Sequence, residues 1–403
     1  MILIDLSHTS HTRARTGIQR VVRSLLDECG ALAPLAPITW DPYAGEWREL
    51  AGWERKNLQT PGAGSKRSAS WPTSARWTGR WRAWRRGAGP AVAGALNDAA
   101  GRSGPAPRGL LVPEFFGDST AKAFPALFAA VGGPKIAVFH DAIALQMPEI
   151  SPPKTVARTP AYLLELARFD GVAAVSEDSR QTLLDFWAWA GVANAPPVRT
   201  VPNGIRPPER HAGGDRPPGP PRILCVGTLE GRKNHLSLLE ACQELWSRGA
   251  EFSLRLVGTV QAETGAAARD RALALAAAGR PLQFDGALSD QDVDSAYQKC
   301  DFTVYPSLME GFGLPVLESV AHGKPCICSA RGALGEAARG GGCLAIDDVN
   351  PTGLARALSR LLESPGELAR LVAEASSRPV RTAADQARDL IDFLASLSSP
   401  AQK

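Results

Sequence analysis

The feature that most constrains the fold is a repeat of short apolar runs, each followed by a turn and then by a helical pattern. From residue 130 onward the clearest runs are KIAVFHDAI, GVAAVSEDS, RILCVGTLE, FSLRLVGTV and DFTVYPSLMEG. Each is apolar almost throughout, as expected of strands buried on both faces. Their alternation with helices predicts parallel α/β sheets. Since such sheets bind ligands beyond the carboxyl ends of their strands, the residues after each run become candidate site residues.

The length of 403 residues is enough for two domains. A stretch dense in proline and glycine, GIRPPERHAGGDRPPGPPR, cannot continue a helix or a central strand, and it predicts a linker over 206–220. We therefore expect an N-terminal domain over 1–205 and a C-terminal domain over 221–380. The segment 381–403 contains an amphipathic helical pattern, and one arrangement is that this helix crosses back to the N-terminal domain.

Composition is that of a globular protein, with 44% hydrophobic and 21% charged residues. The formal net charge of +4 does not call for a nucleic acid partner, and none is expected. Seven cysteines without a CxxC pair are typical of reduced thiols in a cytosolic protein. No apolar stretch approaches the roughly 18 residues of a membrane span. We expect a cytoplasmic protein, and any membrane contact would be peripheral, at the inner face.

The segment 50–110 breaks the α/β rhythm and is interpreted as an insertion. Its central part, SKRSASWPTSARWTGRWRAWRRGAG, holds seven basic residues, four tryptophans and no acid. If 77–86 is helical, Trp77, Trp81 and Trp84 share one face, with arginines around the rest. This pattern is typical of a helix in a membrane interface. Two alternatives stay open: tryptophans that pack on the N-terminal domain, and a patch that binds single-stranded RNA.

The motif LMEGFGLPVLE follows a buried run and contains two carboxylates, which suggests at first an acid and base pair. Pro315 suits the first turn of a helix. Gly311 and Gly313 would let the backbone approach a ligand closely. The amides at 314–317 would then be the free donors of a helix N-terminus, which is a site for anions.

EGFGLPVLE followed by SVAHGKPCICS resembles the signature of retaining glycosyltransferases of family 4. The resemblance implies the GT-B fold, an α/β architecture of two Rossmann-like domains that face each other across a cleft. It implies that Glu318 binds the ribose of a nucleotide sugar and that Glu310, the expected catalytic residue, lies beside the transferred sugar. Neither acid then needs to donate a proton. The donor would also contact the backbone around these acids, at Gly311, Phe312, Gly313, Leu314, Val316 and Leu317.

A second match to the same family is CVGTLEGRKNHLSLLEA. Lys233 falls on the family's lysine position, where it would contact the donor diphosphate. Many members have an arginine where this chain has Thr228, so Arg232 is the candidate for the second cation. The alternative is that both basic residues begin a solvated helix. A cation is poorly placed at a helix N-terminus, which favours an anionic partner.

The acids of GALSDQDVDSAYQKCD could be read as a metal-binding Asp-x-Asp motif. Ser289 has instead the character of a helix N-cap, and Asp290, Asp292 and Asp294 would lie in the first turns, where the helix dipole favours acids. We interpret them as structural. No metal and no cofactor other than the nucleotide sugar substrate are expected.

Two segments of the N-terminal domain, the run VFHDAIALQMPE and the loop after the first strand, are expected to complete the site. VFHDAIALQMPE resembles the family's His-Asp position, which implies that His140 lines the donor sugar and that Asp141 orients the histidine ring or meets the acceptor. A purely structural histidine is the alternative. In GVAAVSEDSRQTLL, Ser176 is interpreted as a helix cap.

The loop SHTSHTRARTGIQRVVRSLL follows the first strand and resembles the family's phosphate and acceptor loop. Gly17 would allow its close approach, and donors would come from Arg13, Arg15, Arg20, His8 and His11. The run TGIQR resembles a subset of these enzymes assigned to mannose or rhamnose transfer in polysaccharide synthesis.

These observations lead to the expectation of a retaining hexosyltransferase. The preferred donor is GDP-mannose, and UDP-hexoses or dTDP-rhamnose are alternatives. The acceptor would be a glycan or a lipid-linked glycan of a surface polysaccharide. A non-catalytic scaffold at a membrane and a sugar-nucleotide hydrolase or epimerase are the competing interpretations.

Overall fold

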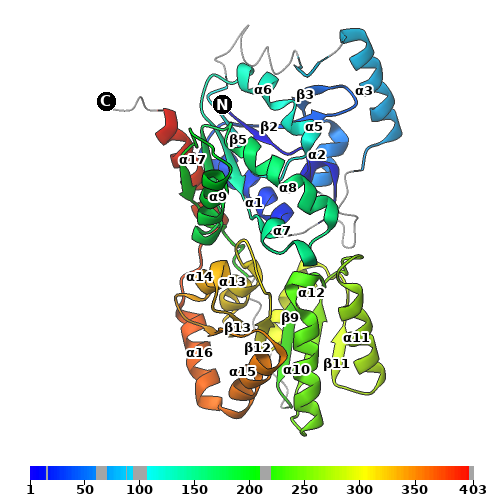
Figure 1. The fold of residues 1–403 in the computed structure, drawn as a ribbon, viewed down its shortest axis with the longest axis vertical. Helices are drawn as coiled ribbons and strands as arrows, with labels where there is room; N and C mark the ends of the chain where they lie inside the picture. The colour runs from blue at the N-terminus through cyan, green and yellow to red at the C-terminus, as the bar shows by residue number, and fades with distance from the viewer. Residues whose placement is uncertain (15–16, 60–69, 88, 94–106, 209–218, 399–403) are drawn as a thin grey trace. The chain divides into compact units, whose positions relative to one another are not determined.

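The computed structural model describes residues 1–403 except 15–16, 60–69, 88, 94–106, 209–218 and 399–403. The chain divides into two compact units (Figure 1). The N-terminal unit comprises Met1–Asp141, Arg158–Gly204 and Arg381–Lys403, and the C-terminal unit comprises Ala142–Ala157 and Ile205–Val380.

The segment Ala142–Ala157 differs from the expectation that all of 1–205 belongs to the N-terminal domain. It groups with the C-terminal unit, where Ile150 packs so closely on Gly231 that a Cβ added to the glycine would lie 3.0 Å from that of Ile150. Apolar packing of this short segment, rather than its position in the sequence, decides the unit to which it belongs.

The N-terminal unit has one sheet with the strand order β4-β3-β2-β1-β5-β6-β7-β8 among the described residues. All neighbouring strands are parallel except β2 and β3, which are antiparallel. Its elements are β1 (Ile2–Asp5), η1 (Thr9–His11), α1 (Gly17–Leu32), β2 (Leu35–Asp41), β3 (Glu46–Glu49), α2 (Gly52–Gln59), α3 (Thr73–Arg86), β4 (Ala91–Val92), β5 (Gly109–Val112), α5 (Asp118–Ala121), α6 (Phe124–Ala130), β6 (Lys135–Phe139), α8 (Pro153–Leu166, which begins in the other unit), β7 (Gly171–Ala174), α9 (Glu177–Trp189), β8 (Val198–Thr200) and α17 (Ala383–Ser398).

The C-terminal unit has a parallel sheet with the order β11-β10-β9-β12-β13-β14. Its elements are α7 (Ile143–Gln146), η2 (Pro148–Ile150), β9 (Arg222–Val226), η3 (Gly231–Lys233), α10 (His235–Ser247), β10 (Ser253–Val257), α11 (Ala266–Ala277), β11 (Leu282–Phe284), α12 (Asp290–Lys299), β12 (Phe302–Tyr305), α13 (Leu314–Ala321), β13 (Cys326–Ser329), α14 (Gly332–Ala338), β14 (Cys343–Ile346), α15 (Pro351–Glu363) and α16 (Pro365–Ser377).

Both faces of this second sheet are covered, because its strands present apolar side chains in both directions. Ile223 and Cys225 pack with α10 and α15 on one face, whereas Leu224 packs with Tyr297 of α12 on the other. The five apolar runs are the strands β6, β7, β9, β10 and β12. The predicted α/β architecture with two Rossmann-like sheets, one parallel and one mainly parallel, is confirmed.

The C-terminal helix α17 packs on the N-terminal unit, against α1 and the first residues of two strands (Figure 1). Gly109 and Gly171 begin β5 and β7, and a Cβ at either position would lie within 3.0 Å of the helix, 2.6 Å from Leu394 and 2.8 Å from Phe393. Small residues at these strand starts therefore make room for the apolar face of α17.

The described part of the insertion contains α2, α3 and β4, and the predicted helix over the tryptophans is present as α3. No helix in the described part of the chain combines the length and the hydrophobicity of a membrane span.

Candidate functional site

The carboxyl edge of the C-terminal sheet brings the two family-like motifs together. β9 and β12 are adjacent parallel strands, although β10 and β11 lie between them in the chain. The strand order reverses here, since the chain runs outward from β9 in one direction and from β12 in the other. Such a switch point leaves room for a ligand between the loops that follow the two strands.

The loop after β12 ends at Gly313, which caps α13 with a φ of +96°. Residues with a side chain rarely adopt this conformation, so glycine is required at this turn. Pro315 lies in the first turn of α13, as predicted. The amides of Val316 and Leu317, predicted to be free donors, both donate to the carbonyl of Gly313, at 3.1 and 3.4 Å.

The loop after β9 contains the two candidate cations. Arg232 and Lys233 lie in the short 3-10 turn η3, and α10 begins only at His235, so the alternative that they begin a solvated helix does not hold. Asn234 lies between η3 and α10 in a left-handed conformation. Its side-chain amide donates to the carbonyls of Pro306 and Val349. These bonds fasten this loop to the loops after β12 and β14.

Glu310 is the centre of a buried ion cluster. One carboxylate oxygen lies 2.6 Å from Nη1 of Arg232, and the other lies 2.6 Å from Nζ of Lys233. Arg232 also contacts Glu230 at 2.8 Å. The ammonium of Lys233 lies 4.5 Å from the centre of the Tyr305 ring and donates to its hydroxyl.

Burial and the neighbouring charges of the cluster shift the pKa values of Glu310 and Lys233. Burial alone would raise the pKa of Glu310, but Arg232 and Lys233 together lower it to about 2. Burial lowers the pKa of Lys233, and the charge of Glu310 opposes this effect. Glu310 is therefore ionised at neutral pH and cannot act as a general acid in this arrangement. The contacts of Glu310 with both cations hold their charged ends at one point on the sheet edge.

Glu318 lies within α13 and is half-buried. Its carboxylate accepts a hydrogen bond from Tyr297 of α12 at 3.3 Å. The Tyr297 ring stacks on His322, whose Nδ1 in turn donates to the carbonyl of Glu318 at 2.7 Å. The glutamate is thus oriented by a neighbouring helix, which the motif alone does not reveal.

Two further predictions in this unit concern Thr228, a candidate donor contact, and the acids of α12, which were interpreted as structural. Thr228 lies on the loop after β9, with its hydroxyl 3.4 Å from that of Thr259. Ser289 caps α12 by accepting from the amide of Asp292, which confirms the predicted cap. Asp294 faces His322 at 3.3 Å. Among the described residues, no group of three or more His, Cys, Asp or Glu side chains could hold a metal ion.

His140 and Asp141 follow β6 of the N-terminal unit. Nε2 of His140 donates to the carbonyl of Pro113 at 2.9 Å, and burial lowers the pKa of the ring. The imidazole is therefore neutral, with its hydrogen on Nε2. The backbone carbonyl of His140 accepts a hydrogen bond from the hydroxyl of Ser179 at 3.0 Å. Ser176 caps α9 as predicted.

The predicted acceptor loop has both surface and buried residues. Gly17 begins α1, Arg20 lies half-buried one turn later, and Arg15 lies outside the described residues. Arg13 is exposed and donates to Asn57 at 3.1 Å.

His11 of the same loop was expected to offer a donor, but it is buried. Its Nε2 lies 2.8 Å from Glu54, which also binds Arg48, and its ring packs on Trp71. The physical reason is that α2 supplies a buried carboxylate for the imidazole. His11 therefore fastens the loop to the insertion.

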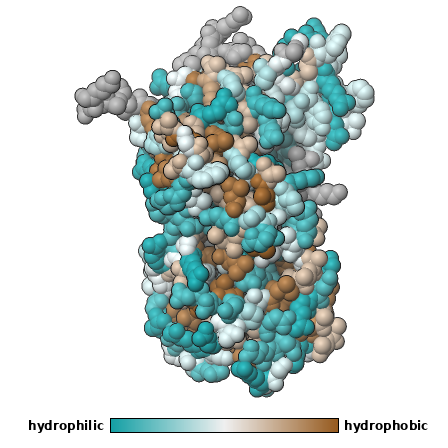
Figure 2. All heavy atoms as spheres, viewed as in Figure 1, coloured by the Kyte–Doolittle hydropathy of each residue, from teal (hydrophilic) through white to brown (hydrophobic). Residues whose placement is uncertain are grey.

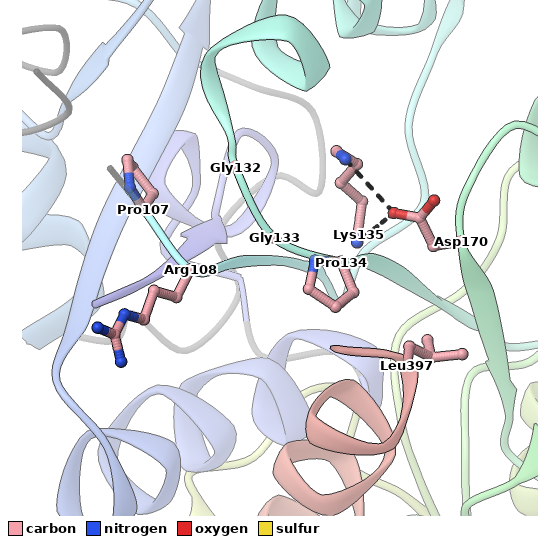
Figure 3. Close-up of a pocket in the computed structure, with 8 residues that line it drawn as sticks. All are labelled: Pro107, Arg108, Gly132, Gly133, Pro134, Lys135, Asp170 and Leu397. Atoms are coloured by element: carbon pink, nitrogen blue, oxygen red, sulfur yellow. Dashed lines mark hydrogen bonds and ion pairs between the residues drawn. The ribbon is translucent and has the colours of Figure 1, made fainter. Parts of the chain in front are cut away.

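A cavity of about 590 Å³ lies in the N-terminal unit, at the amino ends of its strands (Figure 3). Lys135 and Asp170 face each other on its wall, 3.5 Å apart between Nζ and the carboxylate. Because open α/β sheets bind ligands beyond the carboxyl ends of their strands, this cavity is not the candidate site.

Sequence reasoning missed the partners that support the motif residues. Tyr305, Glu230, Tyr297 and Asn234 all contact or orient the named site residues. A weak signal existed for Tyr305, because a tyrosine at the end of an otherwise apolar strand needs a polar partner for its hydroxyl. The sequence has no comparable signal for Glu230, Tyr297 or Asn234.

The chain is similar in sequence to known proteins over most of the C-terminal unit and over most of its length. Residues 208–378 match the family model described as Glycosyl transferases group 1. The chain is 27% identical over 348 residues to the serotype-specific mannosyltransferase WbdA of Escherichia coli, an alignment that covers 81% of this chain and 38% of that protein. The chain thus spans well under half the length of this relative.

Two solved structures resemble the whole chain. Sucrose-phosphate synthase from Thermosynechococcus elongatus superposes with a TM-score of 0.66 at 18% identity, covering 98% of both chains. Anabaena HepE in complex with UDP and glucose superposes with a TM-score of 0.63 at 14% identity, covering 98% of this chain and 99% of that one. At these identities the likeness concerns the fold, and it agrees with the two sheets described above.

Proposed function

We propose that this chain, which has the GT-B fold and carries a domain of the Glycosyl transferases group 1 family at residues 208–378, is a retaining hexosyltransferase. It moves a hexose from a nucleotide sugar to a glycan or to a lipid-linked glycan. The observation that carries the proposal is the ion cluster, in which Arg232 and Lys233 converge on buried Glu310 beside the start of α13.

The two cations suit the charge that develops when a nucleoside diphosphate leaves. A diphosphate gains negative charge as its bond to the sugar breaks, and fixed cations in a buried site stabilise that charge without reorganising. Glu310 holds both cations in place before the donor binds. Since its carboxylate stays ionised, it supports the positive charge of the sugar rather than donating a proton.

The proposed reaction needs no protein nucleophile. The bond from the anomeric carbon to the phosphate oxygen breaks, and the acceptor oxygen bonds to that carbon on the same face. The acceptor hydroxyl passes its proton to the departing phosphate. Arg232 and Lys233 stabilise the diphosphate, and no metal is required.

The remaining roles follow from chemistry and from the resemblance of the motifs. Glu318 accepts hydrogen bonds from the ribose, and Tyr297 orients it. His140, neutral and with Nε2 already donating, would offer Nδ1 as an acceptor to a sugar hydroxyl. Asp141 and the loop with Gly17, Arg13, Arg15 and Arg20 are assigned to the acceptor and phosphate side.

GDP-mannose is the preferred donor, and a surface polysaccharide is the preferred product. The support is that WbdA, similar over most of this chain, is a serotype-specific mannosyltransferase. A UDP-hexose is the second candidate, because HepE was solved with UDP and glucose. A lipid-linked acceptor would bring the enzyme to the cytoplasmic membrane surface.

The test is to incubate the full chain with GDP-mannose, UDP-glucose and dTDP-rhamnose, each with and without a lipid-linked glycan and with EDTA present. We expect one donor to yield a glycan heavier by one hexose, with the anomeric configuration of the donor by NMR. Lys233→Ala should abolish transfer, whereas Lys299→Ala, a change of an exposed lysine on α12, should not. Nucleotide release without a glycosylated product would indicate a hydrolase, and no turnover of any donor would favour a scaffold.

A further inference from the structure

The helix α3 is fastened to the N-terminal unit along one side only. Gly79 is buried on that side, where a Cβ would lie 2.9 Å from that of Tyr43. Arg82 and Arg86 point the same way and reach the carboxylate of Glu46 at 2.8 and 3.1 Å. The insertion thus packs on the domain, and two of its arginines are neutralised there.

The tryptophans of α3 lie on the opposite side. At about 100° per residue, Trp77, Trp81 and Trp84 fall on the face away from Gly79. Their exposed fractions are 67%, 55% and 80%. The alternative that these three tryptophans pack on the N-terminal domain is therefore wrong. Exposed indoles at this density are uncommon on a soluble surface and indicate a partner.

The charge around this face is positive. Helix α3 has no acidic residue and Arg85 is exposed, whereas Arg76 and Arg80 each lie 5.8 Å over the ring of Tyr43. Arg85 lies 4.8 Å over the ring of Trp81, so that charge and indole are presented together. A surface of this kind is complementary to negative charge at a boundary between apolar and aqueous phases.

The composition of the face distinguishes among partners. Figure 2 shows the surface over α3 in pale and teal tones, without the brown of aliphatic side chains that marks a core-like protein interface. A second copy of the chain would bring two cationic faces together, which is unfavourable. Tryptophan with arginine is the pairing favoured at the headgroup level of a bilayer.

We propose that the outer face of α3, defined by Trp77, Trp81, Trp84 and Arg85, docks on an anionic lipid bilayer. The indoles enter the boundary between headgroups and acyl chains, and Arg85 contacts acidic headgroups. The helix lies at the β3-β4 edge of its sheet and on the outside of its unit (Figure 1), so it can lie flat on a surface without unfolding. The proposal does not depend on the transferase activity.

The experiment is co-sedimentation of the full chain with phosphatidylcholine vesicles, with and without about 30 mol % phosphatidylglycerol. We expect binding to the anionic vesicles that weakens with salt. Changing Trp77, Trp81 and Trp84 together to alanine should weaken partitioning roughly tenfold or more. Arg85→Gln should weaken it roughly fivefold at low salt and only on anionic vesicles.

Two control variants distinguish binding through the outer face of α3 from general effects of a substitution. Trp189→Ala removes a tryptophan that is 82% exposed at the end of α9, and it should bind vesicles as the wild type does. Lys233→Ala should also bind normally, even if it transfers no sugar. Equal binding by the triple tryptophan variant, or an equal loss with Trp189→Ala, would overturn the proposal. So would binding of a labelled single-stranded RNA or of an acidic protein through this face while vesicles are not bound.

Discussion

The carboxylate of Glu310 lies 2.6 Å from the ammonium of Lys233, and both side chains are buried, with exposed fractions of 8% each. Arg232 completes the cluster from the other side of the carboxylate. An incoming diphosphate would therefore compete with a protein carboxylate for the same two cations. This relationship has consequences for stability, affinity and turnover that can be measured separately.

Glu310→Gln should separate binding from catalysis. Without the competing charge, Arg232 and Lys233 should bind free nucleoside diphosphate more tightly, while turnover falls by about a hundredfold because the sugar loses its carboxylate. Calorimetry and steady-state rates measure the two effects. A parallel loss of nucleotide affinity and turnover would instead assign Glu310 to ordinary donor binding.

The same substitution should destabilise the protein without ligand. Removing one partner of a buried ion pair leaves uncompensated charge, which costs about 3 kcal/mol in the free energy of unfolding. Added pyrophosphate should restore much of that loss, because it supplies the missing anion. Urea unfolding with and without pyrophosphate tests this, with Glu244→Gln, which removes one partner of a surface ion pair with Arg248, as control.

Glu318 should act on the nucleoside and not on the phosphates. Glu318→Gln should weaken the affinity for a nucleoside diphosphate roughly tenfold, since hydrogen bonds to a charged acceptor are lost. Its affinity for pyrophosphate should not change. Tyr297→Phe, which removes the 3.3 Å hydrogen bond to Glu318, should show a smaller effect of the same kind. An equal loss for both ligands would contradict the ribose assignment.

Gly313→Ala tests the turn that begins α13. The glycine has a φ of +96°, and an added Cβ would lie 3.1 Å from Leu334. The strain should lower the free energy of unfolding by about 1–2 kcal/mol and shift the start of the helix. Gly366→Ala is the matched control, because nothing lies within 4 Å of a Cβ at that position. Donor affinity should fall only for Gly313→Ala.

The free energy of unfolding should fall as the pH rises from acid to neutral, because the N-terminal unit contains a buried carboxyl pair. Burial, with the charge of Glu114, raises the pKa of Asp5 from 3.8 to about 7, and burial raises that of Glu114 from 4.5 to about 7. A group with a raised folded pKa binds more protons when folded, so stability decreases as pH rises from about 4 to 7. Asp5→Asn should reduce this slope in urea unfolding, whereas Asp27→Asn, at an exposed carboxyl of α1, should not.

Much of the architecture could be predicted from the sequence because its signals are local. Continuous apolar runs identify buried strands, and the caps at Ser176 and Ser289 and the proline of α13 were recognised by residue type. Two motifs after adjacent strands identified the candidate site residues of the C-terminal unit. Local chemistry was sufficient for these features.

The contacts of the site could not be predicted because they depend on which strands become neighbours. The pairing of Glu310 with both cations follows from the adjacency of β9 and β12, and the burial of His11 follows from the carboxylate of Glu54 on α2. The orientation of α3 was likewise open, since its sequence contains both a tryptophan face and a small-residue face. Packing at Gly79 decides between them.

In the proposed function, Arg232 and Lys233 bind the diphosphate of a nucleotide sugar. The most direct measurement is a titration of GDP-mannose, and then of UDP-glucose and dTDP-rhamnose, onto the full chain, Lys233→Ala and Lys299→Ala. We predict that one donor binds the wild type and Lys299→Ala equally and binds Lys233→Ala at least about tenfold more weakly. Unchanged donor affinity in Lys233→Ala, or no binding of any donor to the wild type, would exclude this role of the two cations.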